Sequence, residues 1–109
     1  MSSEYVNVDE AVSRIGGNVN LYKKLLGRFV DGNHYDILES ALQSGDTEGA
    51  SHQAHSLKGV SANLSLSKIW SITVELEQLL KDGADCSSCM SELKEAFTST
   101  LEKISEIMS

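Results

Sequence analysis

Apolar positions in this chain recur every three or four residues, the spacing that places side chains on one side of an α-helix. Five segments with this spacing are predicted to be helical: residues 8–15, 19–43, 46 to about 63, 65 or 67 to about 82, and 87–108. Proline is absent, and most glycines fall between these segments. The pattern therefore favours long helices joined by short turns.

Turn residues separate the predicted helices. Asp31-Gly32-Asn33 interrupts the second segment, so a kink or a break is expected there. Gly45 and Asp46 are suited to end one helix and begin the next, and Ser65 or Ser67 to cap the fourth. Because such short connections make successive long helices antiparallel, the sequence predicts an all-α, up-down-up-down four-helix bundle with a short additional N-terminal helix.

The third predicted helix presents one histidine on its outer face. Its core-facing stripe consists of Ala50, Ala54, Leu57, Ser61 and Leu64. At about 100° per residue, His55 points about 140° away from the centre of this stripe, toward solvent. Lys58 lies one turn further on, and Gly59 almost directly above His55, where a larger side chain would overlie the imidazole. A glycine inside a helix costs about 1 kcal/mol relative to alanine, and access to His55 is a reason for that cost.

These residues resemble the signature of the histidine-containing phosphotransfer (HPt) family, which is histidine, any residue, leucine or isoleucine, lysine and glycine. The signature reads His55-Ser56-Leu57-Lys58-Gly59 in this chain. The resemblance extends from Val8-Asp9-Glu10-Ala11 and Gly16-Gly17-Asn18 through Leu76-Glu77, with Ser65 standing where the family usually has glycine. It implies the same helical bundle.

The resemblance also implies a function, that of a phosphoryl carrier without independent catalytic activity. His55 would accept the group from the phospho-aspartate of one response-regulator receiver domain and pass it to the aspartate of another. An imidazole nitrogen is a nucleophile, and the ammonium of Lys58 suits phosphoryl oxygens. His52, Ser56 and Ala62 would belong to the docking face, formed by the second and third predicted helices. No cofactor is expected in this chain, because the receiver domain would bring Mg²⁺. The partners would be receiver domains and a hybrid sensor histidine kinase. The protein itself is expected to be a monomer.

Two alternatives stay open. One keeps the fold and makes this a P1-type domain of a chemotaxis-like kinase, phosphorylated by an ATP-binding kinase domain. The other is a scaffolding or metal-binding bundle in which His52 and His55 hold an ion.

Cys86 and Cys89 lack the strand-then-helix context of a redox motif, and they lack two further zinc ligands. We therefore interpret them as small residues beginning the last helix. His34 carries no motif. Glu75, Glu77 and Gln78 could serve contacts on the helix surface, although the resemblance to the HPt family places the Leu76-Glu77 pair mainly as scaffold.

The net charge and the lengths of the apolar runs exclude further classes of partner and of location. Sixteen acidic and nine basic residues give a net charge of −7, which opposes binding to nucleic acid and to anionic membranes. No apolar run approaches the ~20 residues of a membrane span, and Met1 to Tyr5 lack the basic start and apolar segment of a signal peptide. We therefore expect a cytoplasmic protein, with residues 1–109 forming a single domain.

Overall fold

The computed structural model describes residues 3–109, which form six α-helices and no strand. The helices are α1 (Val8–Arg14), α2 (Val19–Asp31), α3 (His34–Gln43), α4 (Thr47–Asn63), α5 (Ser67–Asp82) and α6 (Ser87–Met108). Within residues 3–109, none of the helices is both long enough and apolar enough to cross a membrane. Met1 and Ser2, from the segment in which no signal peptide is expected, lie outside the described residues. The all-α prediction is confirmed.

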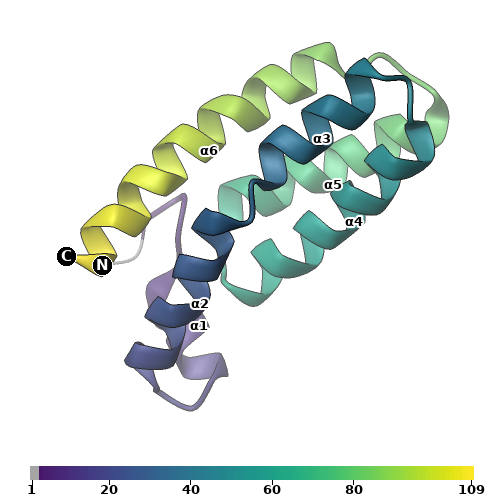
Figure 1. The fold of residues 1–109 in the computed structure, drawn as a ribbon. Helices are drawn as coiled ribbons and strands as arrows, with labels where there is room; N and C mark the ends of the chain where they lie inside the picture. The colour runs from purple at the N-terminus through teal and green to yellow at the C-terminus, as the bar shows by residue number, and fades with distance from the viewer. Residues whose placement is uncertain (1–2) are drawn as a thin grey trace.

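Helices α3 to α6 pack side by side, and α1 and α2 lie at one end of this group (Figure 1). Helix α4 packs against α3 and α5, and α5 packs against α6, which also contacts α3 and α2. The connecting turns are residues 44–46, 64–66 and 83–86. Fully buried leucines from five helices fill the centre of the fold: Leu26, Leu38, Leu57, Leu76 and Leu93. The packing gives a helical bundle with extents of 40 × 21 × 21 Å.

The predicted second helix is two helices, which corrects the expected count. Gly32 follows the end of α2 and donates its N–H to the carbonyl oxygen of Phe29 at 3.2 Å. Asn33 then takes a left-handed conformation with φ 52° before α3 begins. Because asparagine reaches this conformation more readily than most residues, the chain changes direction here at low cost. As a result α2 leaves the line of α3 and extends beyond α4 and α5 (Figure 1).

The turn before α4 forms as expected. Gly45 has φ 77°, a conformation that glycine adopts without steric cost. The carboxylate of Asp46, the N-cap of α4, accepts a hydrogen bond from the backbone N–H of Gly49 at 2.8 Å. This bond satisfies one of the free donors in the first turn of α4.

The turn after α4 differs from the prediction that Ser65 or Ser67 caps the following helix. The N-cap of α5 is Leu66, which makes no side-chain capping bond, and Ser67 is already the first helical residue. Ser65 has φ 55° and is buried. Its hydroxyl donates to Glu10 Oε1 at 2.6 Å and accepts from Arg14 Nη1 at 3.2 Å. The capping prediction was wrong because the side chain bonds to α1 instead of to α5.

Arg14 donates hydrogen bonds to carbonyl oxygens at the C-terminal end of α4. Its Nη1 also donates to the carbonyl oxygens of Ala62 at 2.9 Å and Asn63 at 2.7 Å. The last four carbonyls of a helix have no partner within the helix. The Ala62 carbonyl also accepts from the backbone N–H of Ser65 at 3.3 Å, so Arg14 adds a second bond there and is the donor to the Asn63 carbonyl. Helix α1 therefore fixes the end of the helix that carries His55.

Candidate functional site

His55 lies on the exposed face of α4, as the sequence predicts. Its side chain is 77% exposed. The predicted stripe of Ala50, Ala54, Leu57, Ser61 and Leu64 is buried throughout. Burial of that stripe holds α4 against the core and leaves the imidazole pointing away from it.

Gly59 keeps the surface above His55 open. A Cβ placed on Gly59 would meet no atom of residues 3–109 within 4 Å, apart from its chain neighbours and the backbone of its own helix. Packing therefore does not require glycine here. The same measurement refines the sequence argument, because a methyl group alone would not contact the imidazole. Only a longer side chain, leaning back toward the preceding turn, would cover it.

Glu77 on α5 lies close to both Lys58 and His55, the two charged or titratable site residues of α4. Its Oε2 lies 3.2 Å from Lys58 Nζ, and its Oε1 lies 3.7 Å from His55 Nδ1. The Lys58 side chain is 34% exposed and that of Glu77 only 26%, so this ion pair is partly shielded from water. The three side chains form one cluster across the α4–α5 contact.

One oxygen of Glu77 lacks a hydrogen-bond partner. Among the described residues, Oε1 is buried and accepts no hydrogen bond. An unsatisfied buried acceptor is costly, and the separation from His55 Nδ1 is slightly too long for a hydrogen bond. A small rotation of the exposed imidazole would bring Nδ1 within range. The resemblance placed Glu77 mainly as scaffold, with a helix-surface contact left open, and the sequence did not indicate that its partner is His55. Only the pairing of α4 with α5 brings the carboxylate to the imidazole.

The predicted docking residues His52, Ser56 and Ala62 are all exposed on α4. His52 makes no hydrogen bond or ion pair within the described part of the chain, whereas His55 lies beside Glu77. The two outward histidines thus have different surroundings. Only His55 has both a neighbouring carboxylate and a glycine four residues on.

His34, the third histidine, packs at the start of α3. Its ring stacks on Phe29 with centroids 5.1 Å apart, and its Nδ1 lies 3.2 Å from Gln53 Nε2. Partial burial lowers the pKa of His34 below its usual value. These contacts make His34 part of the α2–α3–α4 packing.

The two cysteines are free and lie near the start of α6. Cys89 is buried, its thiol donates to the carbonyl oxygen of Ile72 at 3.6 Å, and burial raises its pKa to about 11. A thiol with a raised pKa is a poor nucleophile and a poor metal ligand. Residues 3–109 contain no group of three or more histidine, cysteine, aspartate or glutamate side chains that could hold a metal ion.

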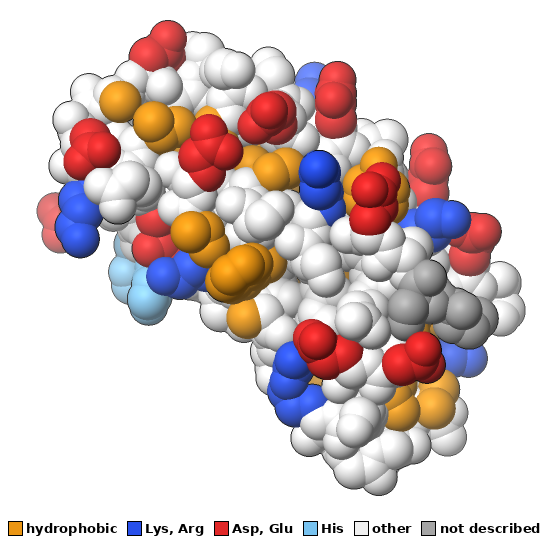
Figure 2. All heavy atoms as spheres, turned by 180° about the vertical axis from the view of Figure 1, so that it is seen from behind, with side chains coloured by type: hydrophobic (Ala, Val, Ile, Leu, Met, Phe, Trp, Pro, Cys, Tyr) orange, Lys and Arg blue, Asp and Glu red, His pale blue; other side chains and the backbone are white. Residues whose placement is uncertain are grey.

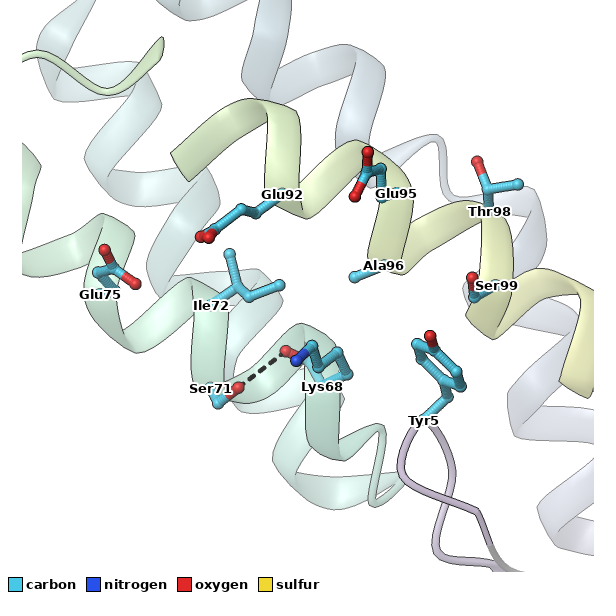
Figure 3. Close-up of a pocket in the computed structure, with 10 residues that line it drawn as sticks. All are labelled: Tyr5, Lys68, Ser71, Ile72, Glu75, Glu92, Glu95, Ala96, Thr98 and Ser99. Atoms are coloured by element: carbon cyan, nitrogen blue, oxygen red, sulfur yellow. Dashed lines mark hydrogen bonds between the residues drawn. The ribbon is translucent and has the colours of Figure 1, made fainter. Parts of the chain in front are cut away.

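A groove of about 770 Å³ lies between α5 and α6, away from His55 (Figure 3). Glu75, Glu92 and Glu95 border it together with Lys68 and Tyr5. Three carboxylates against one ammonium disfavour an anionic ligand. The groove therefore does not suit phosphate-bearing molecules.

The fold and the site together define an all-helical domain with an exposed histidine on a central helix. The family model of the Hpt domain matches residues 32–105, well over half of the chain, and the chain belongs to this family. Hpt domains transfer phosphoryl groups through histidine in phosphorelays, act as phosphocarriers rather than catalysts, and interact with receiver domains and histidine kinases. The match includes α3 to α5 and most of α6 but not α1 and α2. Neither the search of curated proteins nor the search of solved structures gave a match.

Proposed function

We propose that this protein carries a phosphoryl group on His55 between receiver-domain aspartates in a two-component His–Asp phosphorelay. The observation that supports it most is the position of His55, 77% exposed on α4 beside Lys58 and under the open space at Gly59. In a member of the Hpt family, such a histidine has both the nucleophile and the access that transfer requires.

Glu77 orients the nucleophile in this proposal. With its proton on Nδ1, facing Glu77 Oε1, the imidazole keeps the lone pair on Nε2 directed to solvent. Nε2 attacks the phosphorus atom, a P–N bond forms, and the bond between phosphorus and the aspartate oxygen breaks. The electron pair of that bond stays on the aspartate carboxylate. The ring then carries positive charge, which the Glu77 carboxylate stabilises.

Lys58 supplies a positive charge that stabilises the transferred phosphoryl group. Its Nζ lies 3.2 Å from Glu77 in the unphosphorylated protein, and an ammonium on a flexible stem can turn toward phosphoryl oxygens on His55. In the reverse step, the aspartate of a second receiver attacks phosphorus and the P–N bond breaks. No group of the carrier is consumed.

The proposal has further parts. His52, Ser56 and Ala62 belong to the contact surface around His55, and a receiver domain supplies Mg²⁺. The phosphate originates from a hybrid sensor histidine kinase. The carrier works as a cytoplasmic monomer, and the short turns at 44–46, 64–66 and 83–86 favour an antiparallel order of α3 to α6.

The test is transfer from a receiver domain labelled on its aspartate, in the presence of Mg²⁺. We expect the wild-type protein and His52→Gln to acquire acid-labile, base-stable label, and His55→Gln to acquire none. Both changes are at exposed positions and should alter the free energy of unfolding by about 0.5 kcal/mol or less. Label on His55→Gln but not on His52→Gln would refute the assignment. Labelling by an ATP-binding kinase domain but by no receiver would select the P1-type function instead.

A further inference from the structure

Helix α5 exposes two large apolar side chains next to the histidine site. Trp70 is 43% exposed and Val74 is 40% exposed. Positions 70, 74 and 77 are four and three residues apart, so Trp70 and Val74 share one face of α5 with Glu77. Figure 2 shows hydrophobic side chains on the molecular surface beside histidine, lysine and acidic side chains. We call Trp70 and Val74 the α5 apolar face.

The α5 apolar face lies within reach of any partner that reacts at His55. Reacting atoms must approach to about 3–3.5 Å, so the partner surface has to be centred near the imidazole. An interface of standard size covers about 800 Å² on each protein, a patch of roughly 16 Å radius. At 1.5 Å per residue, Trp70 lies about 10 Å along α5 from Glu77. Because Glu77 Oε1 is 3.7 Å from His55 Nδ1, the patch includes Trp70.

We propose that the α5 apolar face is a docking surface for the receiver domain that exchanges the phosphoryl group with His55. This inference rests on the proposed function and adds α5 to a surface that the sequence placed on the second and third predicted helices alone. The receiver is favoured as occupant because the face is continuous with the reacting site. A second copy of this chain is disfavoured, since each copy has a net charge of −7.

Trp70 is the side chain expected to contribute most to this contact. Tryptophan is enriched among the residues that dominate protein–protein affinity, and it loses a large apolar surface to the partner when it is covered. Glu77 and Lys58 pair with one another beside it. Trp70 and Val74 would therefore provide binding energy, while His55 provides the chemistry.

The chain contains a single tryptophan, so its emission reports directly on this surface. The experiment titrates the protein with a receiver domain that lacks tryptophan. We expect a blue shift of Trp70 emission on binding. By calorimetry, Trp70→Ala should raise the Kd at least about tenfold, and Trp70→Phe should raise it less. Leu101→Ala is the matched control, because Leu101 is 37% exposed on α6, and its Kd should equal that of the wild type.

Each outcome has a distinct meaning. If label transfers to His55 but Trp70 emission and the Kd of Trp70→Ala stay unchanged, the docking surface is wrong and the proposed function stands. If no receiver labels the wild-type protein, the proposed function itself fails. A blue shift that follows protein concentration without receiver, with dimers in sedimentation, would show that a second copy covers Trp70 and would overturn the inference. Far-UV circular dichroism of each variant verifies that it folds.

Discussion

Replacement of Gly59 separates access to His55 from the stability of α4. Glycine inside a helix is about 1 kcal/mol less favourable than alanine, and leucine is close to alanine. A Cβ at this position meets open space, so no steric penalty offsets the gain. Gly59→Ala and Gly59→Leu should therefore each raise the free energy of unfolding by about 1 kcal/mol. For a domain of this size, that corresponds to a Tm increase of about 4–8 °C.

The two variants should differ in phosphoryl transfer. The methyl group of alanine does not reach the imidazole, so Gly59→Ala should transfer at nearly the wild-type rate. The leucine side chain leans toward the preceding turn and covers His55. Misplacement of reacting groups by about 1 Å can cost a factor of about 100, and we expect at least this loss for Gly59→Leu. The assay is the initial rate of labelling from a phosphorylated receiver, with thermal unfolding measured on the same samples.

Gly27 offers a matched control. It lies inside α2, and a Cβ there would sit 3.8 Å from Met108 Cε, an ordinary van der Waals contact. Gly27→Ala should give a similar gain in Tm and leave the transfer rate unchanged. If Gly59→Leu raises the Tm and still transfers like the wild type, glycine is not needed for access. A lower Tm would instead show that the space above His55 is filled in solution.

Two predictions concern stability. Arg14→Ala removes the side-chain donor at the end of α4 and should lower the free energy of unfolding by about 1–2 kcal/mol in denaturant titrations. Arg28→Ala, at an exposed arginine of α2, is the control, and equal effects of the two changes would contradict the role of Arg14. The folded-state pKa of His34 is depressed by burial, so the unfolded state takes up the proton first as the pH falls below about 6.5. Stability should decrease toward acid in that range, and His34→Gln should reduce the decrease. Unfolding at pH 7.5 and at pH 5.5 measures both proteins, and an unchanged slope would refute the assignment to His34.

The orientation of His55 could be predicted from the sequence because it depends only on local geometry. A fixed angle per residue relates His55 to the stripe from Ala50 to Leu64, and burial of that stripe decides which way the histidine points. The interruption at residues 31–33 was also visible, because glycine and asparagine mark it. Whether it kinks or breaks the helix was settled by the left-handed conformation of Asn33.

Glu77 and Ser65 show what only the tertiary structure decides. Glu77 reaches His55 and Lys58 because α5 packs on α4 in one register, and a slide of one turn, about 5.4 Å, would remove both contacts. Ser65 bonds to Glu10 and Arg14, which are more than 50 residues away in sequence. Helical periodicity fixes which side of a helix a residue occupies. It does not fix which residue of another helix lies opposite, because that depends on how the two surfaces pack.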